Sequence, residues 1–369
     1  GAVALMRAVD PAISPGQILY VLQQTCDPID AANPEYIGKL GCGRVNVSAA
    51  LQRTIERVQQ QSLPSSQDER DVPSASLIIT TVDGKKPMML FSNNGIPDPV
   101  QTLFPYGASR IPFSLAASRD GSLIASAAGK GGGPQVRLFD RSFQLKSQFF
   151  AYDARFHGGV SVAIGDIDGD GEHDVITAPG PGGGPHIRIF DQAGGLKYQF
   201  MAQGITGKNG LRIAAADVNS DGRSDILVTA LRGSNSQVSI YSSDGTLITR
   251  FTPYTKKIGT ATLAVGDIDG DGEQDIITAP SKGGAMLKVY SIHGSQKAAW
   301  HPFGKNFLGG IHASIGDMNS DGTDEIVATP LSKGGPQVRV FFGDGTLASQ
   351  FFAFAKTMRT GLLTLVVHD

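Results

Sequence analysis

The stretch GDIDGDGEHD, residues 165–174, places four aspartates and one glutamate within ten residues. At an effective dielectric constant of about 20, two carboxylates roughly 4 Å apart repel each other by about 4 kcal/mol. The same spacing recurs in three further stretches: ADVNSDGRSD at 216–225, GDIDGDGEQD at 266–275 and GDMNSDGTDE at 316–325. The first acidic residues of the four stretches are 51, 50 and 50 positions apart. A fixed period of about 50 residues is typical of a propeller or a solenoid.

Each repeat contains four short segments with the pattern of β-strands. In the repeat that holds the first acidic stretch, these segments are VSVAI, DVITA, HIRIFD and LKYQFMA. They alternate apolar and polar residues, and Gly, Pro, Asp and Asn separate them. Four antiparallel strands per repeat predict one blade of a β-propeller.

The number of blades follows from the aromatic residue at the end of each repeat's last strand. Six such residues occur, and we interpret them as core residues between blades rather than as ligand-stacking residues: Phe104, Phe149, Phe200, Phe251, Trp300 and Phe351. The repeat at 76–106 lacks its first strand, and the C-terminal GLLTLVVHD (361–369) has the pattern of the missing strand. The sequence therefore predicts an all-β six-bladed β-propeller, closed by its C-terminal strand and preceded by a short α-helical segment.

The acidic stretches have the ligand spacing of a calcium loop. Oxygen-bearing side chains stand at positions 1, 3, 5 and 9, a backbone carbonyl at position 7 can join them, and Gly at position 6 permits the sharp turn. A bound cation would cancel the repulsion between the carboxylates, whereas the alternative is a solvated turn. Magnesium fits less well, because it takes fewer protein ligands and keeps its waters. The sixteen candidate ligands are Asp166, Asp168, Asp170, Asp174, Asp217, Asn219, Asp221, Asp225, Asp267, Asp269, Asp271, Asp275, Asp317, Asn319, Asp321 and Glu325.

One repeat departs from the pattern. Near 116–124 it keeps Asp120 and Gly121 but has Ala116 and Ser118 where carboxylates would stand. We therefore expect about four structural Ca2+ sites and no site in this repeat.

Composition excludes several classes of protein. Of 369 residues, 40% are hydrophobic and 18% are charged, which is typical of a soluble globular chain. The formal net charge of −2 argues against a nucleic-acid or anionic-membrane binder. No apolar run approaches the roughly 20 residues that span a bilayer. Cys26 and Cys42 are either two buried thiols or one disulfide, and the sequence leaves both possibilities open.

The first 60 residues have helical rather than strand periodicity. Ser14 is a predicted N-cap, with Pro15 at the first helical position and Gln17 three residues after the cap. Another helix is expected to start at Asn46 and to run through VSAALQRTIERVQQQ. Residues 61–75 (QSLPSSQDERDVPSA) are polar and rich in Pro and Ser, which indicates a linker. The expected organisation is thus a helical segment over 1–60, a linker over 61–75 and a propeller over 76–369.

Residues 76–369 resemble the calcium-binding FG-GAP and VCBS-type repeats of integrin-like and bacterial extracellular propellers. The resemblance rests on the four acidic loops, on APGPGGGPHIRIFD (178–191) and on SQFFAYD (147–153). It implies a propeller with mainly structural calcium, an extracellular or cell-surface location, and a protein or polysaccharide ligand at the cell surface or matrix. We expect a monomer with no nucleic-acid partner and no transmembrane segment.

Residues 1–55 resemble the C-terminal end of a subtilisin-like serine protease domain. The matching elements are GAVAL at 1–5, SPGQI at 14–18 and GCGRVN at 41–46. In that family a helix beginning GAxAL directly follows the nucleophilic serine, so the catalytic Asp, His and Ser would all precede Gly1. No residue here inherits a catalytic role, and we expect the chain to be a fragment or processed product that is inactive by itself.

Two further sets of residues are weaker candidates for function. Arg137, Arg188, Lys288 and Arg339 recur at one strand position and would form either a basic ring or a solvated, salt-bridged face. Arg212 and His312 each lie five residues before an acidic loop and would face the channel. Glycine-rich turns such as GPGGGP lack the Lys-Ser/Thr ending of a phosphate-binding loop, so we interpret them as close-packed turns.

Three functional hypotheses follow. The first is the C-terminal binding or adhesion propeller of a secreted subtilisin-like protease. The second is a stand-alone adhesion or binding propeller with no enzymatic parent. The third, a polysaccharide-acting propeller enzyme, needs a cluster of Tyr, His, Lys or Arg in the channel, for which the sequence offers only Arg212 and His312.

Overall fold

The computed structural model describes residues 2–9, 18, 21–22, 25, 44–61, 75–92, 95, 97–109, 111–231, 237–254 and 260–368. The chain divides into two compact units, one of residues 1–72 with 96–99 and one of residues 73–95 with 100–369. The predicted cap at Ser14, the two cysteines and most of the predicted linker lie outside the described residues.

The first unit contains two described helices, α1 (Ala2–Val9) and α3 (Val47–Gln61). Helix α3 starts next to the expected residue, Asn46, and the Asn46 side chain caps it: its Oδ1 accepts a hydrogen bond of 2.9 Å from the Ala49 amide. Met6 of α1 and Ala50 of α3 are fully buried and belong to one apolar cluster with Ile18 and Val21. Helix packing in this unit therefore follows the apolar periodicity of the sequence.

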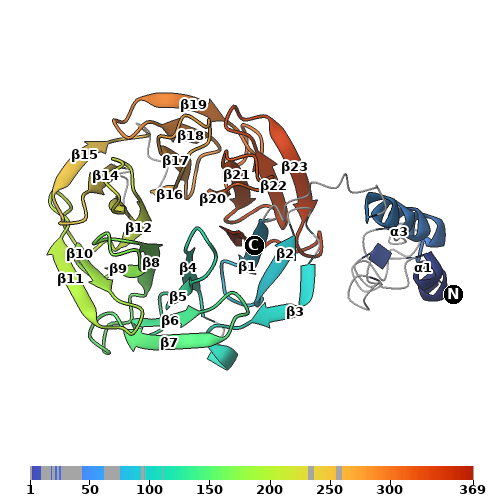
Figure 1. Cartoon of the computed structure of the whole chain (residues 1–369), viewed down its shortest axis with the longest axis horizontal. Helices are drawn as coiled ribbons and strands as arrows, with labels where there is room; N and C mark the ends of the chain where they lie inside the picture. The colour runs from blue at the N-terminus through green and yellow to red at the C-terminus, as the bar shows by residue number, and fades with distance from the viewer. Residues whose placement is uncertain are drawn as a thin grey trace. The chain divides into compact units, whose positions relative to one another are not determined.

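The second unit is a six-bladed β-propeller, as the sequence predicted (Figure 1). Each blade is one antiparallel sheet of four strands, and neighbouring inner strands contact one another around the axis. From the inner strand outward, the blades are β24 (Leu362–Val367), β1 (Ser76–Thr81), β2 (Met88–Ser92), β3 (Pro97–Leu103); β4 (Phe113–Ala117), β5 (Ile124–Ala128), β6 (Gln135–Phe139), β7 (Leu145–Phe150); β8 (Val160–Gly165), β9 (Asp174–Pro179), β10 (His186–Phe190), β11 (Leu196–Met201); β12 (Leu211–Ala216), β13 (Asp225–Ala230), β14 (Val238–Tyr241), β15 (Leu247–Phe251); β16 (Ala261–Gly266), β17 (Asp275–Pro280), β18 (Leu287–Tyr290), β19 (Gln296–Trp300); and β20 (Ile311–Gly316), β21 (Glu325–Pro330), β22 (Gln337–Phe341), β23 (Leu347–Phe352). A single-turn 3-10 helix, η3 (Gly107–Ser109), follows the first blade.

Burial decreases from the second strand of each blade to the fourth. Strands β1, β9, β17 and β21 are buried at every position, because both faces of the sheet pack against neighbouring blades. The outer strands are mostly exposed, as in β11 and β23. The second strands accordingly consist of nearly continuous apolar and small residues, with no alternation between polar and apolar positions.

The C-terminal strand closes the ring. Strand β24 pairs with β1 from Ser76↔Val367 to Thr81↔Leu362 and so supplies the inner strand that the first blade lacks. Leu362 and Val367 are fully buried, and Val366 is 7% exposed. The two ends of the propeller sequence are therefore joined within one sheet.

The aromatic residue at the end of each outer strand packs against the next blade. The ring centroids of Phe149 and Phe190 are 4.8 Å apart, and those of Phe251 and Tyr290 are 4.9 Å apart. Phe200, Trp300 and Phe351 make equivalent contacts with the rings of Tyr241, Phe341 and Phe91. The interpretation of these residues as core between blades is confirmed for these five.

The recurring basic residues of the third strands form inter-blade latches, which neither sequence interpretation anticipated. Arg188 Nη1 donates a hydrogen bond of 3.0 Å to the Ala151 carbonyl, and its guanidinium lies over the Tyr152 ring at 5.4 Å. Both partners belong to the connection from the preceding blade. Arg137, Lys288 and Arg339 repeat this arrangement with the Pro105, Pro253 and Pro302 carbonyls and the rings of Tyr106, Tyr254 and Phe303. These charges therefore hold adjacent blades together, and none of them forms a solvent-facing ring.

Deletion of residues 361–369 should destabilise the propeller, because it removes β24. Burial of each large apolar side chain contributes about 1.5–3 kcal/mol, so loss of Leu362, Val366 and Val367 should lower the free energy of unfolding by about 5 kcal/mol. The exposed edge of β1 should also promote aggregation. Urea unfolding and light scattering would measure both effects. Deletion of residues 1–60 is the control and should leave the propeller transition in place; equal transitions for the C-terminal deletion and the full chain would contradict closure by β24.

Candidate metal centres

The four acidic loops occupy the same place in four consecutive blades, between the inner strand and the second strand. The last residue of each inner strand pairs with the ninth loop position, as in Gly165↔Asp174 and Ala216↔Asp225. The pairs Gly266↔Asp275 and Gly316↔Glu325 complete the set. Strand pairing thus fixes both ends of each loop, and the ninth-position carboxylate is the first side chain of a buried strand.

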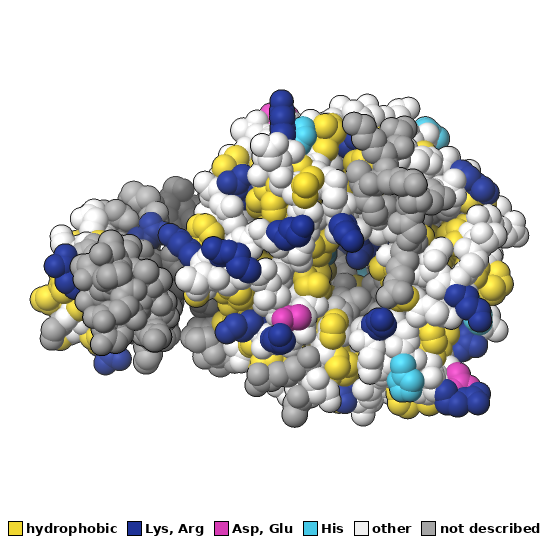
Figure 2. All heavy atoms as spheres, turned by 180° about the vertical axis from the view of Figure 1, so that it is seen from behind, with side chains coloured by type: hydrophobic (Ala, Val, Ile, Leu, Met, Phe, Trp, Pro, Cys, Tyr) yellow, Lys and Arg dark blue, Asp and Glu magenta, His cyan; other side chains and the backbone are white. Residues whose placement is uncertain are grey.

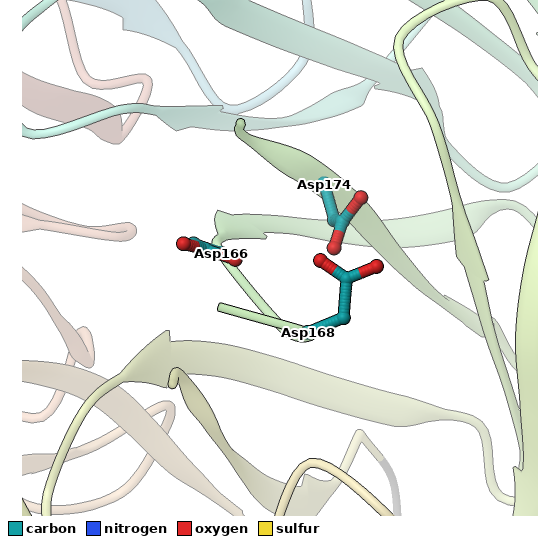
Figure 3. A group of neighbouring side chains, drawn as sticks. All are labelled: Asp166, Asp168 and Asp174. Carbon is teal, nitrogen blue, oxygen red and sulfur yellow. The ribbon is translucent and has the colours of Figure 1, made fainter. Parts of the chain in front are cut away.

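In the first loop, three carboxylates converge. One oxygen from each of Asp166, Asp168 and Asp174 lies within 4.8 Å of the others, and Figure 3 shows the carboxylates of Asp168 and Asp174 facing each other. Asp166 also accepts hydrogen bonds from the amides of Gly169 (2.7 Å) and Gly171 (2.9 Å). These bonds fold the loop around its first carboxylate.

Glycine at position 6 is required by the backbone. Gly171, Gly222, Gly272 and Gly322 have φ values of 83°, 82°, 83° and 91°. A Cβ atom at any of these positions would meet no heavy atom within 4 Å, so space is not the reason for the glycine. The reason is the left-handed backbone conformation, which L-residues with a side chain rarely adopt.

The ninth-position carboxylates are buried in all four loops. Asp174, Asp225, Asp275 and Glu325 are between 0% and 2% exposed. In three loops this carboxylate accepts a hydrogen bond from the backbone amide at position 2: Ile167 to Asp174 at 3.1 Å, Val218 to Asp225 at 3.2 Å and Met318 to Glu325 at 2.7 Å. Glu325 also accepts a hydrogen bond of 2.9 Å from Nδ2 of Asn319. One or two neutral donors are weak compensation for a buried anionic charge.

A lysine on the outer strand completes the first and third loops. Lys197 Nζ lies 2.6 Å from Asp168, 3.3 Å from Asp170 and 2.8 Å from Asp174. Lys297 repeats these contacts at 2.7, 3.4 and 2.9 Å with Asp269, Asp271 and Asp275. Burial disfavours the ammonium form of Lys197, but the hydrogen bonds that it donates to Asp168 and Asp174 outweigh this effect and raise its pKa above the ordinary value. Neither lysine is among the predicted site residues, because both lie more than 20 residues after the loops that they contact.

The second and fourth loops have no such lysine. Strand register places Ile248 and Ala348 at the positions of Lys197 and Lys297. The same two loops have Asn219 and Asn319 at position 3, where the first and third have aspartate. Four ligand carboxylates with one ammonium, or three ligand carboxylates with none, both leave a formal charge of −3. The extra aspartate and the lysine therefore occur together, and this pairing within the repeat is the signal that could have revealed the lysines.

The two asparagine loops have the less compensated buried charge. Burial, with smaller contributions from Asp221 and Asp217, raises the pKa of Asp225 to about 6. Burial, followed by the charges of Asp321 and Asp317, raises the pKa of Glu325 to about 7. Among the described residues, neither carboxylate has an ion pair with a basic side chain. An oxygen-only ligand set with unbalanced negative charge fits a divalent cation such as calcium.

Of the sixteen predicted ligands, the structure brings together two groups of three carboxylates within 4.8 Å among the described residues. They are Asp166, Asp168 and Asp174, and Asp267, Asp269 and Asp271. Asp170 and Asp275 instead contact the lysine of their loop. In the second and fourth loops the amide Nδ2 of Asn219 or Asn319 donates to Asp221 (3.0 Å) or Asp321 (2.9 Å), so the side chains of positions 3 and 5 bind each other.

Residues outside the predicted ligand set tie neighbouring loops together around the axis. Asp324 is 1% exposed, accepts a hydrogen bond of 3.1 Å from the Asp267 amide, and pairs with Arg119 at 2.9 Å. Ser224 donates its amide to the Asp166 carbonyl at 2.6 Å. Arg119, Ser224 and Asp324 line a hollow of about 420 Å³ together with His173, Gln274 and His368. The degenerate loop that contains Arg119 thus has a role in anchoring the fourth acidic loop.

Arg212 and His312 lie on inner strands, and their side chains contact backbone carbonyls of the next blade. Arg212 Nη1 lies 3.4 Å from the Ala261 carbonyl, and His312 Nε2 lies 2.9 Å from the Thr364 carbonyl. Burial lowers the pKa of His312 to about 4, so this imidazole is neutral near pH 7. Both side chains link inner strands across the channel wall.

Comparisons with known proteins agree with the fold. Residues 166–228 and 217–278 match the family model described as FG-GAP-like repeat. Integrin alpha-V of Gallus gallus is 30% identical over 177 residues, which cover 42% of this chain and 17% of the integrin. Integrin alpha pat-2 of Caenorhabditis elegans is 26% identical over 169 residues, which cover 37% and 14%. The chain thus spans less than a fifth of these relatives.

A solved structure of a protein of unknown function from Bacteroides caccae has the same fold. It superposes with a TM-score of 0.53 at 12% sequence identity, and the match covers 80% of this chain and 100% of that one. None of the helices in the described parts of the chain has the length and apolar character needed to cross a membrane.

Lys197→Met should destabilise the metal-free protein by about 1–3 kcal/mol, because buried Asp174 then loses its cationic partner. Lys146→Met is the matched control: Lys146 has the same strand position in the blade without an acidic loop, and its ammonium contacts only Gln192 at 3.5 Å among the described residues. Thermal unfolding in chelator would compare the two variants. Equal melting temperatures of the two variants would show that Lys197 does not compensate the negative charge of the first loop.

Proposed function

We propose that this chain is a calcium-stabilised propeller that binds a ligand outside the cell, as an adhesion or recognition module. The observation that carries the proposal is the set of four acidic loops at one position in consecutive blades, each with a buried carboxylate at position 9. The FG-GAP-like repeats and the integrin relatives support it. The partner would be a protein or polysaccharide of the cell surface or matrix, bound by a monomer.

We propose the sixteen predicted side chains as the calcium ligands, four in each loop. Positions 1, 3, 5 and 9 would supply side-chain oxygens, and the cation would relieve the repulsion that the loops otherwise carry. In the first and third loops, Lys197 and Lys297 would remain beside the ligands and offset the additional aspartate. In the second and fourth loops, the cation would be the main compensation for Asp225 and Glu325.

The parent protein is proposed to be a secreted subtilisin-like serine protease, with this propeller at its C-terminal end. Helix α1 begins at Ala2 and α3 begins directly after the Asn46 cap, in keeping with the helices that the resemblance implies. The alternative is a stand-alone propeller without an enzymatic parent. The sequence encoded before Gly1 discriminates between them, because a GTS-type serine motif immediately upstream supports the protease.

A polysaccharide-acting enzyme is the least supported alternative. Such an enzyme would need Arg212 and His312 to be accessible in the channel. Their contacts with the carbonyls of Ala261 and Thr364 instead support a structural role in joining inner strands.

Calcium titration tests the metal proposal. With a dissociation constant near 10⁻⁴ M at each site, about 1 mM calcium should stabilise the propeller by roughly 1.4 kcal/mol per site and by about 6 kcal/mol in total. Calorimetry should count four sites, and Asp168→Ala should leave three. Asp120→Ala, in the degenerate loop, is the control and should leave four. A melting temperature that does not change on chelation would contradict the proposal.

The chain by itself should show no serine-protease activity, because the resemblance places all three triad residues before Gly1. A fluorophosphonate probe, analysed by mass spectrometry, would measure this directly. Stoichiometric labelling of one serine in the folded chain would be the contrary result.

A further inference from the structure

The propeller has two chemically different faces. Because consecutive strands of a blade run in opposite directions, the acidic loops lie on one face of the ring. The connections from second to third strands, and those from one blade to the next, lie on the opposite face. We call this the crossover face and define it by the described connections 82–87, 129–134, 151–159, 180–185, 202–210, 281–286, 301–310, 331–336 and 353–361.

Basic residues dominate the crossover face, whereas the opposite face carries the acidic loops. Figure 2 shows Lys and Arg side chains at many places on the coloured part of this face, with few carboxylates among them. The described carboxylates are Asp83 and Asp153, each paired with a neighbour, Lys85 at 3.4 Å and Arg155 at 2.8 Å. The exposed basic residues in the described connections are Lys85, Lys86, Lys130, Arg155, Lys208, Lys282, Lys305, Lys333, Lys356 and Arg359.

The connections that carry these residues are tied to one another. The Gly131 amide donates to the His157 carbonyl at 3.0 Å, which joins the connections of Lys130 and Arg155. The Gly283 amide donates to the Leu308 carbonyl at 3.2 Å, which joins those of Lys282 and Lys305. Backbone hydrogen bonds thus hold the connections that carry the basic side chains. Binding of a ligand should therefore cost little backbone conformational entropy.

We propose that the crossover face binds an anionic polysaccharide. This inference rests on the proposed extracellular role and assigns the binding surface and the charge of its ligand. The carboxylate or sulfate groups of such a chain would pair with the exposed ammonium and guanidinium groups. Charges spread around a ring suit a flexible polyanion that contacts several blades, and recognition would depend on charge density.

Other polyanions fit this face less well. Single-stranded nucleic acids bind surfaces that add aromatic stacking to positive charge. The aromatic rings of these connections are instead used between blades: Tyr152 donates to the Thr177 and His186 carbonyls, and Phe303 and Phe307 pack against the apolar cluster shared by the last two blades. Stable attachment to an anionic membrane usually adds an apolar anchor to basic residues. In the described connections, one large apolar side chain is exposed, that of Leu308 at 55%, which is too little for such an anchor.

Binding of the full chain to polygalacturonate and heparin, in 1 mM calcium, tests the inference, with neutral dextran as the reference polymer. We expect binding to both polyanions and none to dextran. With about five ionic contacts, a rise in salt from 50 to 200 mM should weaken binding on the order of 10²-fold, because condensed counterions are released. Binding to dextran, or affinity independent of salt, would overturn the proposal.

Two single variants locate the site. Lys282→Glu, on the crossover face, should weaken binding by about threefold or more, and addition of Lys305→Glu on the joined connection should bring the loss to about tenfold or more, with a shallower salt dependence. Lys146→Glu makes the same charge change on an exposed outer strand and should alter affinity less than about twofold. Equal losses in the two variants would overturn the assignment, as would tighter binding to single-stranded DNA or to phosphatidylglycerol vesicles than to either polysaccharide.

Calcium titration separates this inference from the function on which it rests. Normal calcium binding without polyanion binding would overturn the crossover-face site alone. Absence of calcium binding would overturn the proposed function even if polyanions bind.

Discussion

A buried carboxylate at the start of the second strand is the constraint around which each acidic blade is built. Asp174, Asp225, Asp275 and Glu325 begin strands that are buried almost throughout, so their charge cannot be left to water. The loop places further carboxylates and amides beside this buried carboxylate, and together they can share one cation. In two blades the outer strand adds a lysine to the same cluster. The need to compensate this buried charge therefore brings together residues of the loop, the second strand and, in two blades, the outer strand.

The blades depend on one another through contacts that repeat around the ring. An aromatic residue at the end of one outer strand packs on the third strand of the next blade, and a basic residue of that strand reaches back to the connecting segment. On the axial side, Asp324 and Ser224 tie neighbouring loops together. Closure by β24 completes this series, because without it the first blade would present an unpaired edge.

Net charge does not describe how charge is distributed over the surface. A value of −2 for the chain argued against a nucleic-acid or anionic-membrane partner and left the charge of each face open. Strand alternation, however, sends the acidic loops to one face and the lysine-bearing connections to the other. A bound cation would neutralise part of the acidic face, whereas nothing in the described connections neutralises most of the basic one. The sum over the chain is small because two large opposite contributions cancel.

The sequence by itself determined the repeat, the number of blades, the C-terminal position of the closing strand and the candidate ligands, since all of these follow from spacing along one chain. A period of about 50 residues and a calcium-type spacing are local properties, and each repeat states them again. Only the tertiary structure decided which basic residues are half-buried contacts between blades, which lysines complete a loop, and which exposed charges share a face. Arg188, Lys197 and Lys282 look alike in sequence, yet the first joins blades, the second compensates an aspartate cluster and the third faces solvent. Their roles depend on strand register and on the neighbouring blade, because a side chain's partner in a propeller lies a strand or a blade away rather than beside it in the chain.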